Sequence, residues 1–340
     1  MYIPDYVFDG VPDLGETKEV APGIFWVRMP LPFALNHINL WLLKDGEGWT
    51  IVDTGYNSDE IKKTWLEIVA NKMEGRPVKR LVVTHFHPDH FGLGGWFLDQ
   101  FDIPLWIPTA EWMQARMLCL ETPENLSDSY HKFYHSAGFD QKMMSFVDSR
   151  TGRYAATVST IPLVFNRLSE GRGIKIDGKT WIMIKGEGHC PEHACLYCEE
   201  LNVLISGDQI LPKISPNVSV WPQEPNGDPL DLFLNSFERF RHLPEDVLVL
   251  PSHNAPFRGL HARLDDLAAH HRDRLEETME ACKDGATGVD TLRTLFKRQL
   301  DNHQLFFAIG ESIAHLNHLM HQGLLDRTVD TNGVYIYTKA

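Results

Sequence analysis

Residues 84–90 read Thr-His-Phe-His-Pro-Asp-His, so four side chains that can bind a metal ion fall within six positions. The preceding residues, Lys79 to Val83, form a short, apolar and β-branched run that predicts a strand. Three glycines between positions 92 and 95 permit a tight exit of the chain before a helix. We therefore expect the four side chains to lie on a loop at the carboxyl end of a strand, where α/β proteins usually place their sites.

The spacing within this loop suits two metal ions. His85 and His87 are two positions apart on extended chain, so their side chains project to the same side and can bind one ion together. Pro88 turns the chain, which leaves Asp89 and His90 to face a second ion. Imidazole with carboxylate suits zinc, and less exclusively iron or manganese. A solvated His-rich loop is the alternative, but such a loop need not follow a buried strand and precede a glycine turn.

Three further candidate ligands lie later in the chain, each just past an apolar run that predicts a strand. Since side chains that follow neighbouring strands can converge on one rim of a sheet, these residues can join the loop at 84–90. The three candidates and their strands are His189 after Trp181–Ile184, Asp208 after Asn202–Ile205, and His253 after Val247–Leu250.

The order of these motifs resembles the metallo-β-lactamase superfamily over about residues 24–257. The resemblance implies an α/β fold, an αββα sandwich with its metal site at one rim. It also implies two zinc ions, with iron or manganese as alternatives. The implied ligands are His85, His87 and His189 for the first ion, Asp89, His90 and His253 for the second, and Asp208 between them.

The resemblance also assigns supporting residues. It implies that Asp53, in an Asp-Thr-Gly turn, fixes the metal loop; a plain Asx turn is the alternative. The stretch 188–193 departs from the commoner Gly-His-Thr-Pro-Gly-His pattern, because it carries Cys190 and Glu192. We still expect His189 to be a ligand, and His193 to support the site from behind or to pack in the core. A lone Cys-x-x-Cys at 195–198 is better explained by core packing than by metal or redox chemistry.

We expect a catalytic domain over residues 1–258, beginning with an arm at 1–21. A helical insertion at 109–173 departs from the minimal pattern, with helices predicted at 110–120 and 128–146. Insertions here commonly roof the cleft in the superfamily, so its aromatic and methionine side chains would line an apolar substrate pocket. Helix packing or a subunit interface is an equally good explanation. His131 and His135 are spaced for metal binding, but a satisfied or solvent-facing pair is the better interpretation.

Residues 259–340 predict a small C-terminal module. Helices are expected at 261–283, 289–296 and 304–321, followed by two short strands over 328–338 that turn at Asn332-Gly333. This order resembles a winged-helix module. The helix at 304–321 has no Lys or Arg, which favours a structural or dimerising role over DNA binding.

Composition narrows the function classes. The 340 residues carry a formal net charge of −14, which disfavours extended nucleic-acid binding. No apolar run approaches the length of a membrane span, and the first residues do not resemble a signal peptide. Five cysteines, an odd number, are most simply explained by reduced thiols in the cytoplasm.

We therefore predict a dinuclear metal-dependent hydrolase in which a metal-bridging hydroxide attacks an ester-type carbonyl. Asp89 and Asp208 are the expected catalytic carboxylates, and the expected substrate is a small thioester, lactone or carboxylic ester. Two alternatives use the same residues: a phosphodiesterase or ribonuclease, and an iron-dependent oxygenase. A degenerate binding protein is disfavoured because all seven ligand positions are filled.

Overall fold

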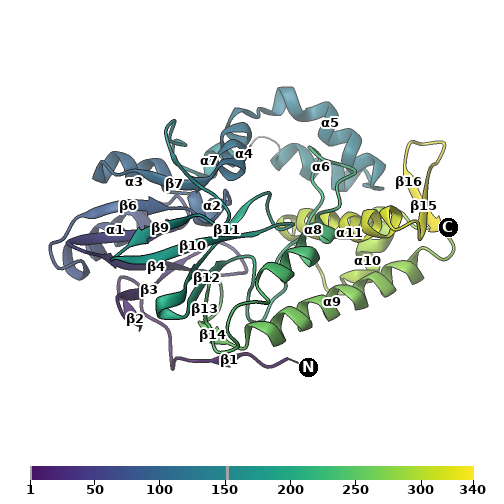
Figure 1. Cartoon of the computed structure of the whole chain (residues 1–340). Coiled ribbons are helices and arrows are strands. Elements are labelled where there is room, and N and C mark those ends of the chain that lie inside the picture. The colour runs from purple at the N-terminus through teal and green to yellow at the C-terminus, as the bar shows by residue number, and fades with distance from the viewer. Residues whose placement is uncertain (1, 151–152) are drawn as a thin grey trace.

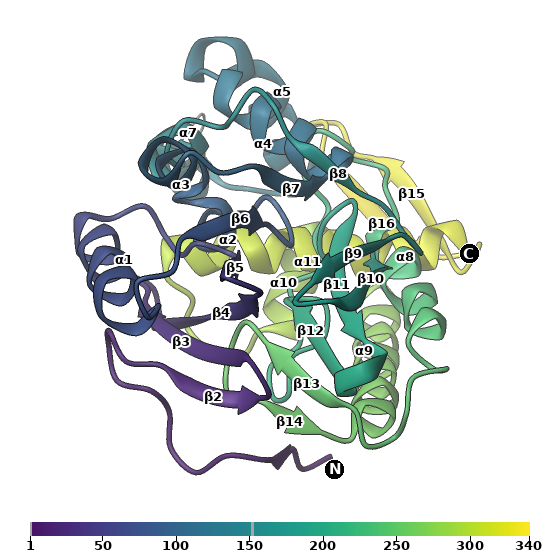
Figure 2. The same cartoon turned by 60° about the vertical axis from the view of Figure 1, so that its left-hand side comes forward.

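The computed structural model describes residues 2–150 and 153–340. Two seven-stranded sheets pack face to face and helices cover their outer faces, as Figures 1 and 2 show. This is the αββα layering expected from the sequence. Among the described residues, no helix is both long enough and apolar enough to cross a membrane.

The first sheet has the strand order β2-β3-β4-β5-β6-β7-β8. Strands β2 to β5 form an antiparallel meander, and β5 to β8 run parallel. Helices α1 and α3 supply two of the parallel crossovers, and Ser58 caps α1 by accepting a hydrogen bond from the Ile61 N–H. The strands are β2 (Lys18–Ala21), β3 (Ile24–Pro30), β4 (His37–Asp45), β5 (Gly48–Val52), β6 (Val78–Val82), β7 (Leu105–Pro108) and β8 (Asn166–Leu168), and the helices are α1 (Asp59–Lys72), α2 (Pro88–Phe91) and α3 (Gly94–Phe101).

The second sheet has the order β1-β14-β13-β12-β11-β10-β9. It is antiparallel except for the pair β12 and β13, which run parallel. Helix α8 connects these two strands, capped by the Asp228 carboxylate with Pro229 in its first turn. The elements are β1 (Asp5–Tyr6), β9 (Gly173–Ile176), β10 (Lys179–Gly186), β11 (His193–Cys198), β12 (Val203–Gly207), α8 (Pro229–Ser236), β13 (Leu248–Pro251) and β14 (Phe257–Arg258).

Three apolar layers hold the sandwich together. Between the sheets lies a cluster that contains Trp26, Trp41 and Trp181, each almost fully buried. A second cluster packs α1 and α3 on the first sheet, and a third packs α8 and α9 on the second. Because both faces of each sheet are covered, the ligand-bearing loops at the rim rest on strands with little freedom to move.

The N-terminal arm expected at 1–21 is modified by two short strands within its described part, residues 2–21. Strand β1 pairs with β14 at the edge of the second sheet, and β2 pairs with β3 at the edge of the first. The segment therefore extends both sheets. The two edge strands were not predicted because they are short and lie among Pro, Gly and acidic residues, so they show little alternation of apolar and polar residues.

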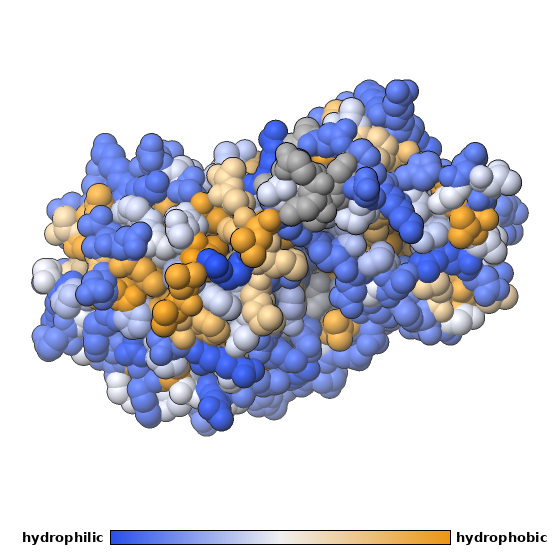
Figure 3. Space-filling model, turned by 90° about the horizontal axis from the view of Figure 1, so that it is seen from above, coloured by the Kyte–Doolittle hydropathy of each residue, from blue (hydrophilic) through white to orange (hydrophobic). Residues whose placement is uncertain are grey.

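The described part of the insertion, residues 109–150 and 153–173, contains four helices and strand β8. The single helix expected at 128–146 is wrong, because Gly138 adopts φ +94° and breaks it into two helices. Seen from above, apolar residues gather over part of the surface (Figure 3). Four apolar residues of the insertion are exposed: Met113, Leu120, Leu163 and Val164. The helices are α4 (Thr109–Leu120), α5 (Pro123–Ser136), α6 (Gln141–Arg150) and α7 (Tyr154–Thr157).

The C-terminal region has the predicted order of helices and strands. Helix α11 packs on α8, α9 and α10, and a hairpin packs on its end. The winged-helix resemblance and the boundary at 258/259 stay predictions. The elements are α9 (Leu260–Ala281), α10 (Gly288–Leu295), α11 (Asn302–His321), β15 (Leu325–Val329) and β16 (Tyr335–Lys339).

Candidate metal centre

The structure brings all seven predicted ligands together at one rim of the sandwich. They form two groups, and within each group the potential ligand atoms lie within 4.8 Å of one another. The loop after β6 supplies His85 and His87, and the short helix α2 that follows it supplies Asp89 and His90. The segments after β10, β12 and β13 supply one residue each. The groups are His85, His87, His189 and Asp208, and Asp89, His90 and His253.

Asp208 lies between the two groups. Its Oδ2 is 3.6 Å from Nε2 of His189 in the first group and 3.5 Å from Nε2 of His90 in the second. Its Oδ1 is 3.3 Å from Nε2 of His253. One carboxylate thus faces nitrogen atoms from both groups, the arrangement needed by a ligand shared between two ions.

Four histidines point Nε2 inward because Nδ1 contacts a protein oxygen behind each ring. Backbone carbonyls accept from two of them: Asn217 O from His189 and His37 O from His253, both at 2.8 Å. Thr84 Oγ1 lies 3.0 Å from Nδ1 of His85, and the Asp53 carboxylate lies 2.8 Å from Nδ1 of His90. Such contacts fix the tautomer and the ring orientation of metal-binding histidines. His87 is the exception, since its Nδ1 faces Nε2 of His85 at 2.9 Å.

The donor set fits divalent cations. Neighbouring ligand nitrogens around tetrahedral zinc lie about 3.3 Å apart, given zinc–nitrogen bonds of about 2.0 Å. The 2.9 Å and 3.4 Å contacts of His85 with His87 and His189 bracket that separation. His90 Nε2 and Asp208 Oδ1 are buried and lack a hydrogen-bond partner among the described residues. Burial, and next the neighbouring histidines, hold the pKa of His85 and of His87 well below 6.5, so both rings are neutral as ligands must be.

Asp53 occupies the supporting position implied by the resemblance. It is buried in the left-handed region at φ +62°. Its Oδ1 accepts the Thr84 N–H at 2.8 Å, and its Oδ2 accepts the Thr84 hydroxyl at 2.7 Å and faces His90. One carboxylate therefore fixes both ends of the metal loop.

His193 lies directly behind the first group. Its Nε2 accepts the backbone N–H of Asp208 at 3.0 Å, and its ring stacks on His85 with centroids 4.7 Å apart. A Cβ at Gly207 would come within 2.3 Å of this ring, so only glycine leaves room for it. His193 belongs to neither ligand group, in agreement with the supporting position expected for it.

The insertion holds the metal loop through Phe86, the residue between two ligand histidines. The Phe86 N–H donates to the Glu111 carboxylate at 3.0 Å, and the Tyr154 hydroxyl donates to the Phe86 carbonyl. Glu111 also accepts the Glu192 N–H at 2.6 Å and bonds the Cys190 thiol. The Cys190 side chain thus meets this buried carboxyl group, whereas Glu192 meets it through a backbone N–H and directs its own carboxylate to the Ala110 N–H. Burial raises the pKa of Glu111 to about 7.

A loop beyond β12 connects the metal site to the C-terminal helix. Asn217, whose carbonyl accepts from His189, bonds Ser219, and Ser219 Oγ donates to the Phe307 carbonyl of α11 at 3.2 Å. The Val220 N–H donates to the Gly310 carbonyl at 3.1 Å. The C-terminal region therefore supports one ligand histidine, a role that the sequence did not indicate.

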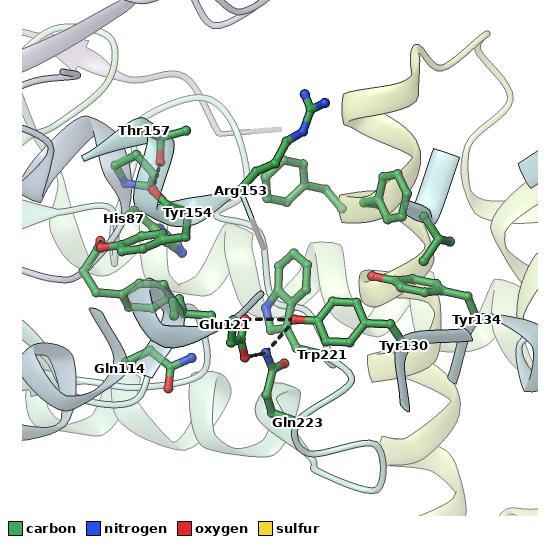
Figure 4. Close-up of a pocket in the computed structure, with 16 residues that line it drawn as sticks. His87, Gln114, Glu121, Tyr130, Tyr134, Arg153, Tyr154, Thr157, Trp221 and Gln223 are labelled. Carbon is green, nitrogen blue, oxygen red and sulfur yellow. Dashed lines mark hydrogen bonds between the residues drawn. The ribbon is translucent and has the colours of Figure 1, made fainter. Parts of the chain in front are cut away.

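A cavity of about 240 Å³ lies beside the metal loop (Figure 4). Its walls come from the metal loop, the insertion, the loop beyond β12 and α11. The insertion therefore lines a pocket, one of the two roles considered for it. Of the seven candidate ligands, only His87 lines the cavity.

Other sequence candidates lie apart from this centre. His131 pairs with Asp148 at 2.5 Å, and His135 bonds the Asn332 carbonyl, so they are a satisfied pair. Cys195 and Cys198 are buried on opposite faces of β11, as core packing predicts.

Sequence reasoning missed Glu111 and Tyr154, and it did not assign Asn217 its role. A glutamate and a tyrosine within helices give no sign in the sequence of the backbone groups that they bind. Asn217 acts through its carbonyl, which every residue type possesses. Thr84 also supports the site and was not predicted, although its position next to His85 could have suggested a role.

Comparisons with known proteins agree with this geometry. A family model described as "Metallo-beta-lactamase superfamily" matches residues 35–253, and one described as "Metallo-beta-lactamase-like, C-terminal domain" matches residues 275–340. The chain is 24% identical to a probable metallo-hydrolase, YqjP, of Bacillus subtilis, covering 92% of this chain and 97% of that one. It is 23% identical to an atrochrysone carboxyl ACP thioesterase of Aspergillus fumigatus, covering 74% of this chain but 46% of that relative.

Solved structures resemble the whole chain. A beta-lactamase domain protein from Burkholderia ambifaria is 42% identical with a TM-score of 0.93, and the match covers 99% of this chain and 98% of that one. A metallo-beta-lactamase family protein from Thermus thermophilus is 27% identical with a TM-score of 0.79, covering 95% and 100%. These matches show that the chain belongs to the metallo-β-lactamase superfamily and that it is a metal-dependent hydrolase.

Proposed function

We propose that this protein hydrolyses an ester-type carbonyl, in a small thioester, lactone or carboxylic ester, with two divalent cations, of which zinc is the first choice. The observation that carries the proposal is the position of Asp208 between two ligand groups at the side of an apolar cavity. When bound, two cations would supply a water-derived nucleophile at neutral pH and polarise the substrate carbonyl.

The side chains divide the remaining work. His85, His87 and His189 would hold one ion, Asp89, His90 and His253 the other, and Asp208 would bind both. Asp89 Oδ2 lies 3.8 Å from Nε2 of His90 and 3.6 Å from Nε2 of His253. Because Asp89 is only partly buried, its carboxylate can also orient a water molecule and take up a proton as the carbonyl is attacked.

The cavity favours a carbonyl substrate over a polynucleotide. Aromatic and aliphatic side chains form most of its lining, and His87 and Arg153 are its only basic lining residues among those described. A phosphodiester backbone needs several cationic contacts. The name of the fungal thioesterase relative is consistent with ester-type chemistry.

The proposal is tested by assaying the purified, zinc-loaded protein against a thioester, a lactone, a carboxylic ester and a phosphodiester. Turnover of at least one carbonyl ester, lost in Asp208→Asn and retained in the exposed control Asp99→Asn, is the expected result. Hydrolysis of the phosphodiester alone would contradict the substrate class. Oxygen consumption with redox-active iron would contradict the reaction class.

A further inference from the structure

The cavity beside the metal loop is placed to receive one part of the substrate. Phe86 and His87, from the metal loop itself, lie in its wall. A substrate whose carbonyl reaches the metal ligands would extend one substituent past His87 into this space. This inference rests on the proposed function, because that function defines which bond lies at the metals.

The lining favours an uncharged hydrocarbon group. Leu118 and Val147 from the insertion line the cavity together with Trp221, from the loop beyond β12, and Phe307, from α11. The rings of Trp221 and Phe307 meet edge to face at 5.9 Å, and those of Phe86 and Tyr154 lie 6.1 Å apart. Walls of this kind bind alkyl and aryl groups by removing apolar surface from water.

A single polar cluster interrupts the apolar wall. Gln223 Nε2 donates to Glu121 Oε1 at 3.0 Å and to the Tyr130 hydroxyl at 2.8 Å, and that hydroxyl donates to Glu121 Oε2 at 3.4 Å (Figure 4). Burial raises the pKa of Glu121, and burial together with the neighbouring Glu121 carboxylate raises the pKa of Tyr130 well above its usual value. The phenol thus stays protonated as a donor.

Glu121 has no cationic partner among the described residues that line the cavity. Arg153 also lines it, but Figure 4 shows its guanidinium pointing away from Glu121. A carboxylate on the buried end of a substrate would therefore meet a like charge, which is costly at a partly desolvated site. A hydrocarbon end, or one with a hydroxyl group, would not.

We propose that the cavity binds the acyl group of the substrate, that this group is an uncharged alkyl or aryl-alkyl chain, and that Glu121 excludes acyl groups ending in a carboxylate. In the reaction, the bond between the acyl carbon and sulfur breaks and a bond to the oxygen of water forms. The carboxylic acid product is released from the cavity, and the thiol leaving group takes up a proton of the attacking water.

The test uses N-acetylcysteamine thioesters of acetate, butyrate, hexanoate, octanoate and adipate with the zinc-loaded enzyme. We expect kcat/KM to rise about three- to four-fold per added methylene until the cavity is full. Hexanoyl should be preferred over adipoyl, and Glu121→Gln should narrow that ratio by on the order of ten-fold. The exposed control Glu67→Gln should leave the ratio unchanged, and Leu118→Trp should move the optimum to shorter chains.

Binding without hydrolysis separates this inference from the proposed function. The thioethers N-acetyl-S-butylcysteamine and N-acetyl-S-octylcysteamine have no scissile carbonyl and are titrated by calorimetry. Tighter binding of the octyl compound, with no thioester hydrolysed, would keep the cavity assignment and refute the reaction. Rates and binding independent of chain length would overturn the cavity assignment, as would a preference for adipoyl that Glu121→Gln leaves unchanged.

Discussion

The metal centre and the neighbouring cavity are built on different principles. In the metal centre, directed contacts tie the side chains from behind: Asp53 holds His90, and backbone carbonyls hold His189 and His253. In the cavity, Glu121, Gln223 and Tyr130 form a polar cluster, and apolar side chains make up most of the remaining lining. The first region fixes positions of atoms, and the second fixes a volume.

This contrast locates chemistry and selectivity in separate parts of the protein. A change in the metal centre should lower the rate for every substrate together. A change in the cavity should alter the ranking of substrates while the metal content stays the same. The insertion belongs to both regions, because Glu111 and Tyr154 hold Phe86 while Phe86 and Tyr154 also line the cavity.

The largest effect is expected for Asp208→Asn, which removes charge shared by both ligand groups. We predict loss of bound metal and a fall in kcat/KM of at least about 10²-fold for all substrates, since one preorganised electrostatic contact alone is worth on the order of 10²- to 10³-fold. Elemental analysis and kinetics measure both quantities. Unchanged metal content with full activity would remove Asp208 from its proposed role.

A smaller loss of metal affinity and activity is expected for Asp53→Asn. Asparagine tolerates φ +62°, so the backbone should survive while the charged contacts with Thr84 and His90 weaken. We predict a loss of about 10- to 100-fold in metal affinity or activity. Asp102→Asn is a matched control, because Asp102 also has positive φ, +50°, at the end of α3. Equal effects in the two variants would indicate backbone strain in place of support for the metal loop.

Glu111→Gln should act on the pH dependence of stability. Burial raises the pKa of Glu111 from 4.5 to about 7, so the folded state holds this proton more tightly than the unfolded state. The free energy of unfolding should therefore fall as pH rises from about 4.5 to about 7, by up to about 3 kcal/mol from this group. Urea denaturation of the metal-loaded protein at several pH values should show a shallower fall in the variant. Parallel curves for the two proteins would refute this assignment.

The smallest effect on the chemistry is expected for Phe307→Ala in α11. This variant removes part of the cavity wall far from the ligands in sequence. We predict unchanged metal content and a loss of about ten-fold in kcat/KM for an octanoyl thioester. This loss is smaller than the free energy gained by fully burying one aromatic side chain would allow. The acetyl thioester should be affected much less. An equal loss for both substrates would argue against separate regions for chemistry and selectivity.

The two regions also differed in how far the sequence predicted them. The metal centre could be assembled in advance because its ligands follow apolar strands in a recognisable order, and Asp53 and His193 were placed by the same resemblance. The cavity was predicted only in part: the insertion was expected to line an apolar pocket, but Leu118, Trp221 and Phe307 look like ordinary apolar residues until the fold brings them together. The edge strands β1 and β2 and the break at Gly138 were missed because strands of two and four residues and a single left-handed glycine leave little periodic signal.

The most direct test of the account is the metal content of the purified chain after reconstitution with zinc and removal of excess metal. The two ligand groups joined by Asp208 predict about two ions per chain, falling in Asp208→Asn together with ester hydrolysis. A chain that takes up no metal, or that hydrolyses esters equally well after complete chelation, would contradict the dinuclear hydrolase.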